Sequence, residues 1–461
     1  MKKLISAVLA TAICIASTFT LNSCIFKNRS TINGVKLSKY SIVYSEDEND
    51  YNKRAAEYIQ SSIEERTALK LDVIEDDEAK RNYEIVVGET NREISKALNK
   101  TTLGVEFNIM ANEDSIALEA THFVIAAAAY FFIDTYTSNE VFETTVPKEI
   151  KTHQPIVKEA KNYIFLIGDG MGVAQTLLPT VMDIPEDRNY GDNEKLFYGY
   201  LLPSFGYSRT DSLSGTTDSA AGGTALSSGY KTLNRNIGID GNSNVVKLLT
   251  ELACELGMSA AVMSTEKQTG ATPASFSAHA EDRGDSSDIK ASQDELVRQY
   301  GIKIDCGFDY YSKTKIEELE QRINSNLDVL DNNENGFFMM YEEAYIDKHC
   351  HNNEIDKTFA AILRFNQVIA TFMEYAFYNP DTFIIITADH ETGGLTDNGE
   401  GGFVYTSEDH TSADVPIFAY GYGAEIFDGK TIENVQIPKT IAKMWGVLDF
   451  GDQTSFPALE D

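Results

Sequence analysis

The sequence predicts an α/β protein: a doubly wound, mostly parallel central sheet with helices on both faces, preceded by a small α/β domain. Beyond residue 160, short apolar segments alternate with amphipathic segments of helical period, which is typical of a parallel sheet covered by helices. The 461 residues are too many for one ordinary domain and suit two. Hydrophobic residues make up 42% and charged residues 24% of the chain, as expected of a globular protein with a large core.

Residues 1–24 are predicted to be a signal peptide that ends in a lipobox. Lys2 and Lys3 precede an apolar stretch over residues 4–21. The segment Leu-Asn-Ser-Cys that ends at Cys24 resembles the lipobox of bacterial lipoproteins, in which the cysteine carries the lipid. A plain secretory peptide with an incidental cysteine is the alternative. Both interpretations predict an exported protein, and the first places it in the cell envelope, in the periplasm or at the cell surface, with membrane attachment through lipid at Cys24.

Residues 25–155 are predicted to form the small N-terminal α/β domain and its linker. The apolar patterns predict strands at 40–44, 71–74 and 84–88, a hairpin at 104–118, and helices at 51–66, 91–98 and 121–136. Residues 146–161 are polar and contain two prolines, which favours a linker. This part of the sequence has no paired carboxylates and no metal-ligand spacing, so we expect a docking or packing module.

Residues 156–461 are predicted to form the catalytic domain. Candidate strands lie at 163–167, 259–263, 336–341, 382–387 and 415–420, and candidate helices at 245–256, 315–327, 356–377 and 438–444.

The charge of the chain limits its partners. With 71 acidic and 39 basic residues the formal net charge is -32, which argues against nucleic-acid binding, because that requires basic patches. The same charge repels anionic substrates. An enzyme of this composition that acts on phosphates therefore needs bound divalent cations, which reverse the field locally.

Two motifs place a reactive side chain among small residues. Asp169 lies in a Gly-Asp-Gly-Met-Gly run directly after the segment 163–167, where open α/β sheets bind their ligands. This run is also compatible with an ordinary Asp-Gly turn. Ser219 lies in a Thr-Asp-Ser-Ala-Ala-Gly-Gly-Thr run, which suits the start of a helix whose amides bind a phosphate. Asp218 or Ser219 would equally serve as the cap of that helix.

Two further motifs contribute oxygen ligands and a phosphate-binding cation. Thr272 carries a hydroxyl that can ligate a hard cation, and Arg283, in the same stretch, can bind phosphate oxygens with its planar guanidinium. Glu342 follows the apolar segment 336–341 and would therefore lie at the edge of the sheet.

Histidines and aspartates are concentrated in the last motifs. Asp347 and His351 are four residues apart and share one face if the segment is helical, as paired metal ligands require. Asp389 and His390 follow the most apolar segment of the chain, and His410 precedes the segment 415–420. Three of the seven histidines fall in these motifs, which favours a metal centre over a chance distribution.

Together and in this order, the motifs resemble those of the alkaline phosphatase family over residues 162–461. The resemblance implies a first zinc ion on Asp347, His351 and His410. It implies a second zinc ion on Asp169, Asp389 and His390. A third site, usually magnesium in the family, would use Asp169, Thr272 and Glu342. Gly270 departs from the family, whose members carry Asp or His at this position beside the third metal, and glycine has no side chain that could ligate.

The resemblance implies metal-dependent hydrolysis of phosphate monoesters, with Ser219 as the nucleophile that forms a phosphoserine and Arg283 binding the phosphate. The substrates would be small phosphorylated molecules, and the resemblance allows a homodimer. Three alternatives stay open: a phosphodiesterase of the same superfamily, a binding lipoprotein with an inactive phosphatase domain, and a purely structural envelope protein. Glu342 and Arg283 favour the monoesterase over the diesterase. The full set of ligands argues against the other two.

Overall fold

The computed structural model describes residues 30–47, 50–98, 102–137, 143–184, 195–307 and 316–460. The predicted signal peptide and Cys24 lie outside these residues. Within them, no helix combines the length and apolar character needed to span a membrane. The chain divides into two compact units, Met1–Ile156 and Val157–Asp461.

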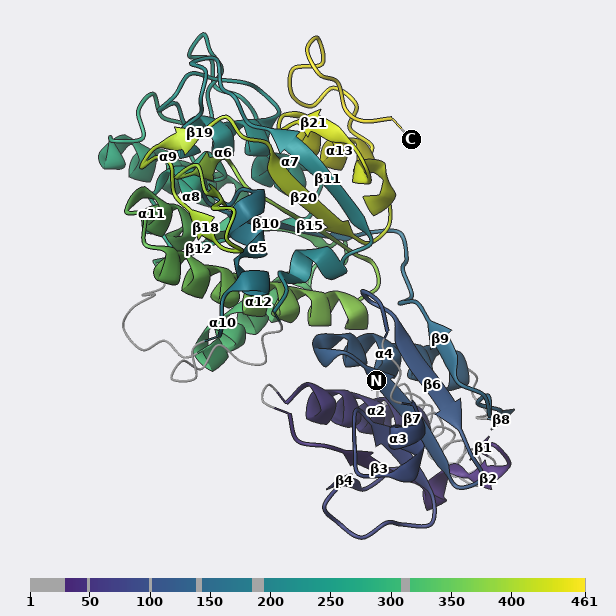
Figure 1. Ribbon diagram of the computed structural model, residues 1–461. Coiled ribbons are helices and arrows are strands. Elements are labelled where there is room, and N and C mark those ends of the chain that lie inside the picture. The colour runs from purple at the N-terminus through teal and green to yellow at the C-terminus, as the bar shows by residue number, and fades with distance from the viewer. Residues whose placement is uncertain are drawn as a thin grey trace, which may run out of the picture. The chain divides into compact units, whose positions relative to one another are not determined.

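The first unit is built on a six-stranded sheet of order β4-β3-β5-β7-β6-β9 (Figure 1). Its strands are β3 (Ser41–Tyr44), β4 (Val73–Glu75), β5 (Glu84–Val87), β6 (Phe107–Ala111), β7 (Ser115–Ala120) and β9 (Lys151–His153). Its helices are α2 (Tyr51–Thr67), α3 (Glu93–Leu98) and α4 (Ile125–Thr137). Three short strands, β1 (Thr31–Ile32), β2 (Val35–Lys36) and β8 (Glu143–Thr144), form a separate small sheet. Helices α2 and α4 contact each other, whereas α3 packs through Ile94 and Leu98 on Val86 and Ala117 of the sheet.

The predicted linker at 146–161 is partly wrong, because β9 lies inside it and pairs antiparallel with β6. The ring of His153 stacks on Phe107, with 5.7 Å between the ring centroids, and also contacts Phe131. The strand contains only Lys, Thr and His, so its sequence has none of the apolar alternation by which strands are recognised.

The second unit contains an eight-stranded sheet of order β13-β12-β14-β10-β15-β20-β11-β21. Its strands are β10 (Asn162–Gly168), β11 (Ser204–Arg209), β12 (Ser259–Ser264), β13 (Lys303–Cys306), β14 (Phe337–Glu343), β15 (Thr382–Thr387), β20 (Val415–Tyr420) and β21 (Thr431–Glu433). Strand β20 runs antiparallel to both of its neighbours, and all other pairings in the sheet are parallel. The predicted doubly wound, mostly parallel sheet is confirmed.

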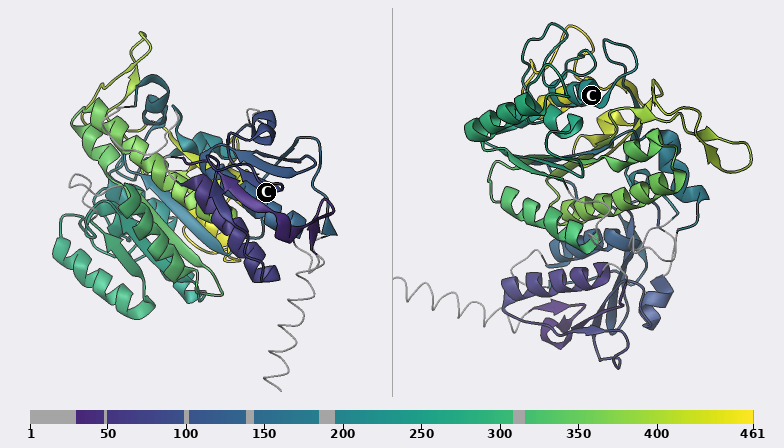
Figure 2. Two further views of the ribbon diagram at one scale, coloured as in Figure 1. Left: turned by 90° about the horizontal axis from the view of Figure 1, so that it is seen from below. Right: turned by 90° about the vertical axis from the view of Figure 1, so that its left-hand side faces the viewer.

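Helices cover both faces of this sheet, as the right-hand view in Figure 2 shows for α10 and α12 on one side. The helices of the unit are α5 (Val173–Val181), α6 (Ser219–Ser228), α7 (Leu249–Glu255), α8 (Ala271–Ser275), α9 (Ser286–Tyr300), α10 (Ile316–Leu330), α11 (Tyr345–His351), α12 (Ile355–Tyr378) and α13 (Gln436–Met444). On one face Phe165 belongs to the same core cluster as Leu249 of α7 and Ile441 of α13. On the other face the ring of Tyr341 packs against Phe365 of α12. Because both faces are buried, the central strands are apolar at nearly every position.

The order of the strands determines where the candidate site lies. Strand β10 lies between β14 and β15, and all three are parallel, so the loops that follow them share one edge of the sheet. In register, Ile167 of β10 faces Glu342 on one side and Thr387 on the other. The segments after β10, β14 and β15 therefore begin next to one another. Figure 1 shows α6, α8, α11 and the short strand β19 (His410–Thr411) in this region of the unit.

Candidate metal centre and nucleophile

One cluster of ligand atoms is formed by Asp169, which follows β10, and by Asp389 and His390, which follow β15. His390 Nε2 lies 3.5 Å from Asp169 Oδ1 and 3.3 Å from Asp389 Oδ2. All three side chains are buried, and neither of these two carboxylate oxygens has a hydrogen-bond partner. The cluster has the donors and the compactness of a cation site.

The protonation of this cluster indicates the same chemistry. Burial and the charge of Asp389 raise the pKa of the Asp169 carboxyl well above its ordinary value. Burial and the charge of Asp347 do the same to the pKa of Asp389. Burial also lowers the pKa of His390, which leaves a neutral imidazole with a free lone pair. A bound cation would relieve the repulsion between the carboxylates and favour their ionised forms.

A second cluster joins α11 to β19. His351 Nε2 lies 3.4 Å from Asp347 Oδ1, as the spacing of four residues on one helix predicted. His410 Nε2 lies 3.6 Å from the same oxygen and 3.0 Å from His351 Nε2. Three ligand atoms from Asp347, His351 and His410 therefore face a common point.

The hydrogen bonds of the two imidazoles show that this point suits a cation. His351 Nδ1 lies 2.5 Å from the carbonyl oxygen of Glu408, and His410 Nδ1 lies 2.9 Å from that of Thr217. Carbonyl oxygens only accept, so both Nδ1 atoms carry a proton, and in the neutral tautomer that this requires both Nε2 atoms present lone pairs. Two lone pairs 3.0 Å apart beside a carboxylate repel one another unless a cation lies between them.

Thr392 links the two clusters, although the sequence analysis assigned it no role. Its hydroxyl donates to Asp347 Oδ1 at 2.6 Å, so its oxygen accepts from His390 Nδ1 at 3.1 Å. This arrangement directs His390 Nε2 toward Asp169 and Asp389. The clusters are also in direct contact, because the ring centroids of His390 and His410 are 3.6 Å apart.

Ser219 is the first residue of α6, and its Oγ lies 3.2 Å from His390 Nε2. The cap of the helix is Asp218, whose Oδ1 accepts from Ala221 N at 3.0 Å. The alternative that Ser219 caps the helix is therefore wrong, and its hydroxyl faces the metal-ligand cluster instead. The helix approaches the loop after β15 so closely that a Cβ on Gly222 would lie 2.8 Å from the carbonyl oxygen of Asp389.

Arg283 lies beside the N-terminus of α6 and is held by the capping aspartate. Its Nη1 donates to Asp218 Oδ2 at 3.1 Å, and 32% of its side chain stays exposed. Its remaining N–H groups can therefore bind the oxygens of a phosphate at the N-terminus of α6.

A third group of oxygen donors lies next to Asp169. The Thr272 hydroxyl, in α8, is buried and has no hydrogen-bond partner. Glu342 is buried at the end of β14, where it accepts a hydrogen bond from Ser264, and burial raises the pKa of its carboxyl. Gly270 precedes α8 as its N-cap and contributes no side chain.

Two other histidines, His349 and His279, lie outside these clusters. His349 is buried, and its Nδ1 is 3.1 Å from Glu354 Oε2. His279 Nδ1 is 2.7 Å from the carbonyl oxygen of Gly238, as a structural histidine would be.

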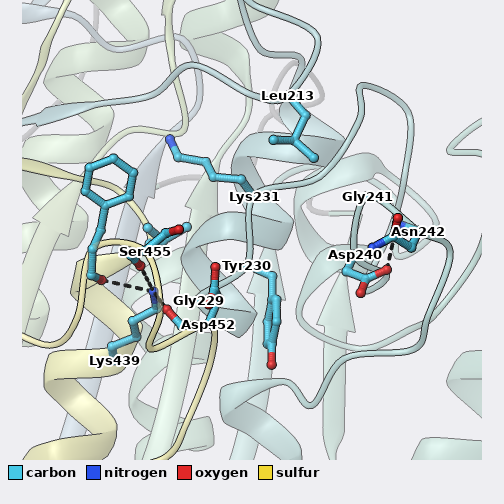
Figure 3. Close-up of a pocket in the computed structure, with 12 residues that line it drawn as sticks. Leu213, Gly229, Tyr230, Lys231, Asp240, Gly241, Asn242, Lys439, Asp452 and Ser455 are labelled. Carbon is cyan, nitrogen blue, oxygen red and sulfur yellow. Dashed lines mark hydrogen bonds between the residues drawn. The ribbon is translucent and has the colours of Figure 1, made fainter.

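A separate pocket of about 420 Å³ lies near the C-terminal end of α6 and contains none of these ligands (Figure 3). Its two lysines already have partners. Lys439 Nζ donates to the carbonyl oxygens of Ser455 at 2.9 Å and Phe456 at 3.0 Å, and Lys231 Nζ lies 3.2 Å from Glu433 Oε2. Ser219 and this pocket lie at opposite ends of one helix, about 15 Å apart at 1.5 Å per residue.

Comparisons with known proteins agree with the geometry. The family model described as alkaline phosphatase matches residues 160–317 and 305–406. Alkaline phosphatase 4 of Bacillus subtilis is 29% identical over 334 residues, which cover 60% of this chain and 71% of that protein. Alkaline phosphatase 3 of the same organism is 27% identical over 375 residues, which cover 69% and 77%.

Solved structures give the same result. The alkaline phosphatase of the Antarctic bacterium TAB5 superposes with a TM-score of 0.54 at 27% identity, covering 62% of this chain and 98% of that chain. A variant of the TAB5 enzyme was solved with magnesium bound in its M3 site.

Proposed function

The chain belongs to the alkaline phosphatase family of phosphatase hydrolases, and we propose that it hydrolyses phosphate monoesters through a phosphoserine on Ser219. The observation that carries this proposal is the position of the Ser219 hydroxyl, 3.2 Å from Nε2 of His390, which belongs to one group of metal-ligand atoms and is in ring contact with His410 of the other.

We propose zinc at both groups. Asp347, His351 and His410 would hold one ion, and Asp169, Asp389 and His390 the other. Each group offers three nitrogen or carboxylate donors, a set that suits zinc, and an ion bound by them could also take an oxygen of the substrate. Bound there, the two ions would supply Lewis-acid stabilisation of charge on the attacking and leaving oxygens. A third site for magnesium would use Asp169, Thr272 and Glu342, which offer only oxygen donors. Magnesium in the M3 site of the TAB5 variant supports this assignment.

The residues of the chain divide the reaction between them. Arg283 and the first amides of α6 would bind the non-bridging oxygens of the phosphate, which presents phosphorus to Ser219 Oγ. Ser219 Oγ bonds to phosphorus as the bond to the ester oxygen breaks in line, and the alcohol leaves with a proton from solvent while the hydroxyl proton passes to solvent. Water then attacks the phosphoserine, which releases phosphate and restores the hydroxyl. Two inversions give overall retention at phosphorus.

The variant Ser219→Ala tests this proposal. It should form no phosphoenzyme when treated with a radiolabelled aryl phosphate, while its zinc content stays that of the wild type. Normal turnover by the variant would overturn the assignment of the nucleophile.

A phosphodiesterase is the second candidate within the superfamily. Arg283 supports the monoesterase, because the guanidinium N–H groups that do not bind Asp218 can bind the free oxygens of a terminal phosphate. Turnover of a mono-aryl phosphate should exceed that of the bis-aryl ester, and the opposite order would favour the diesterase.

We further propose that the protein is exported and attached to the membrane through lipid on Cys24, on the basis of the N-terminal sequence alone. Cys24→Ala should move the protein from the membrane fraction to the soluble fraction. Equal membrane association of both proteins would contradict lipid attachment.

A further inference from the structure

An acidic side chain that the family motif does not include lies beside Gly270, next to the third group of oxygen donors. Gly270 leaves this group without a side chain at the N-terminus of α8, two residues before Thr272. The side chain of Glu266 occupies the space beside Gly270. A Cβ at position 270 would lie 2.2 Å from Glu266 Cγ and 3.2 Å from Glu266 Cδ. The carboxyl end of Glu266 thus lies in the region that a longer side chain at position 270 would enter.

Glu266 is fixed there from two directions. Its backbone N–H donates to Ser264 Oγ at 2.8 Å, and the same hydroxyl donates to Glu342. Its Oε1 accepts from Lys267 N at 2.9 Å, and its Oε2 forms an ion pair with Lys348, the residue that follows Asp347. The carboxylate is thus held at Lys348, next to the proposed ligand Asp347, and the backbone of Glu266 is linked through Ser264 to the proposed ligand Glu342.

The lysines beside Glu266 favour its ionised form. Burial raises the pKa of its carboxyl, but the hydrogen bonds from Lys348 and from the backbone N–H of Lys267, together with the charges of both lysines, outweigh burial, so the pKa is lowered. Glu266 can therefore offer carboxylate oxygens to a cation.

A second observation concerns Thr272, two residues after Gly270. The Thr272 hydroxyl is 1% exposed and has no hydrogen-bond partner. A buried hydroxyl without a partner costs free energy, and a hard cation that takes oxygen ligands would satisfy it. Glu266, Glu342, Thr272 and Asp169 supply oxygens only.

We propose that Glu266 is the acidic residue of the third cation site, in place of the side chain that position 270 lacks, and that Lys348 holds it there. This inference rests on the proposed function, because it assigns a further residue to the third site named there. It differs from the expectation drawn from the sequence, in which Gly270 contributes no ligand and nothing takes its place.

The test is a calorimetric titration of the zinc-loaded, full-length protein with Mg²⁺. Glu266→Gln should weaken Mg²⁺ binding by about 10- to 100-fold, the usual effect of removing a group that supports a metal. Glu295→Gln is the matched control, because it neutralises an exposed glutamate that pairs with Arg298 on α9, away from the site, and it should bind Mg²⁺ as the wild type does.

A double variant separates a lost ligand from a damaged fold. Glu266→Ala with Gly270→Asp moves the carboxylate to position 270. The shortened side chain at 266 removes the contacts with Cγ and Cδ, and a contact of 3.0 Å between the new Cβ and the carbonyl oxygen of Lys267 remains. It should recover most of the Mg²⁺ affinity that Glu266→Ala loses. Gly270→Asp alone should not raise the affinity, because Glu266 occupies the space.

Three outcomes would overturn the inference: wild-type protein that takes up zinc but no Mg²⁺, Glu266→Gln that binds Mg²⁺ as tightly as the wild type, or a double variant no better than Glu266→Ala. If Glu266→Gln also loses zinc or unfolds, the Mg²⁺ affinity of the double variant, compared with that of Glu266→Ala, decides whether Glu266 is a ligand. Failure of the proposed function has a different signature, because the wild type itself would then bind no zinc or form no phosphoserine.

Discussion

Replacing Gly170 by alanine should damage one proposed zinc site selectively. Gly170 follows Asp169 with a φ of +73°, and a Cβ there would lie 2.8 Å from Asp347 Cα and 2.9 Å from Thr392 Oγ1. A left-handed backbone costs a non-glycine residue roughly 1–2 kcal/mol. Overpacking against a backbone atom costs about 1–3 kcal/mol more. We therefore expect Gly170→Ala to lower the free energy of unfolding by about 2–5 kcal/mol and to displace Asp347 from its site.

The matched control is Gly301→Ala. Gly301 ends α9 with a φ of +74°, and no atom lies within 4 Å of a Cβ at this position. The free energy of unfolding of this variant should fall only by the cost of the left-handed backbone, roughly 1–2 kcal/mol. Urea unfolding gives the free energies, and mass spectrometry of dialysed protein gives the zinc content. Gly170→Ala should retain about half the zinc of the wild type. Full zinc content, or a stability loss no larger than that of Gly301→Ala, would refute the reasoning.

Three further perturbations test the electrostatics of the chain. Thr392→Val removes the hydroxyl that joins the two ligand clusters and should weaken zinc binding about 10- to 100-fold, whereas Thr392→Ser should restore it; equal zinc affinity of all three proteins would contradict this. In chelated protein the raised pKa values of Asp169 and Asp389 mean that the folded state holds more protons than the unfolded one, so stability should fall as pH rises above the ordinary carboxyl range. The urea midpoints of zinc-loaded protein should not show this fall between pH 5 and 8. Identical midpoint-against-pH profiles for chelated and zinc-loaded protein would refute the account. In the first unit, burial raises the pKa of Glu119 to about 7, so its contribution to stability is lost as pH rises from 4.5 to about 7. Glu119→Gln should raise the unfolding free energy by about 1 kcal/mol at pH 8 and not at pH 4, and a gain at both values would point to packing instead.

The sequence predicts the centre of the main sheet better than its ends, for a physical reason. Strands β10, β14 and β15 are buried on both faces and appear in the sequence as continuous apolar segments. Strands β13 and β21 lie at the two ends of the sheet and include half-exposed or exposed polar residues such as Lys303 and Thr431. Such strands form because their backbones hydrogen-bond to a neighbouring strand, and the local sequence does not indicate that this neighbour is present.

The sequence also gives the residue types of the site without the contacts that orient them. Metal-ligand types and their order along the chain can be recognised from the motifs. The proton positions on His351 and His410 depend on backbone carbonyls of Glu408 and Thr217, and any residue provides such a carbonyl. The choice between Asp218 and Ser219 as helix cap is undecided in the sequence because both types cap helices equally well. It is resolved only by which side chain turns back to an amide of α6.

The acidic excess of the chain is compatible with an anionic substrate, because the net charge and the charges at the site act over different distances. The net charge of -32 creates a repulsive field at long range, but salt screens it within about 8 Å at physiological ionic strength. The surroundings of Ser219 act at shorter range. They include Arg283 and buried carboxylates whose pKa values are raised, and a bound cation would stabilise the ionised forms of these carboxylates. The same carboxylates that add to the global charge would hold the cations that reverse it locally. The affinity for phosphate should therefore depend on metal occupancy far more than on the net charge of the surface.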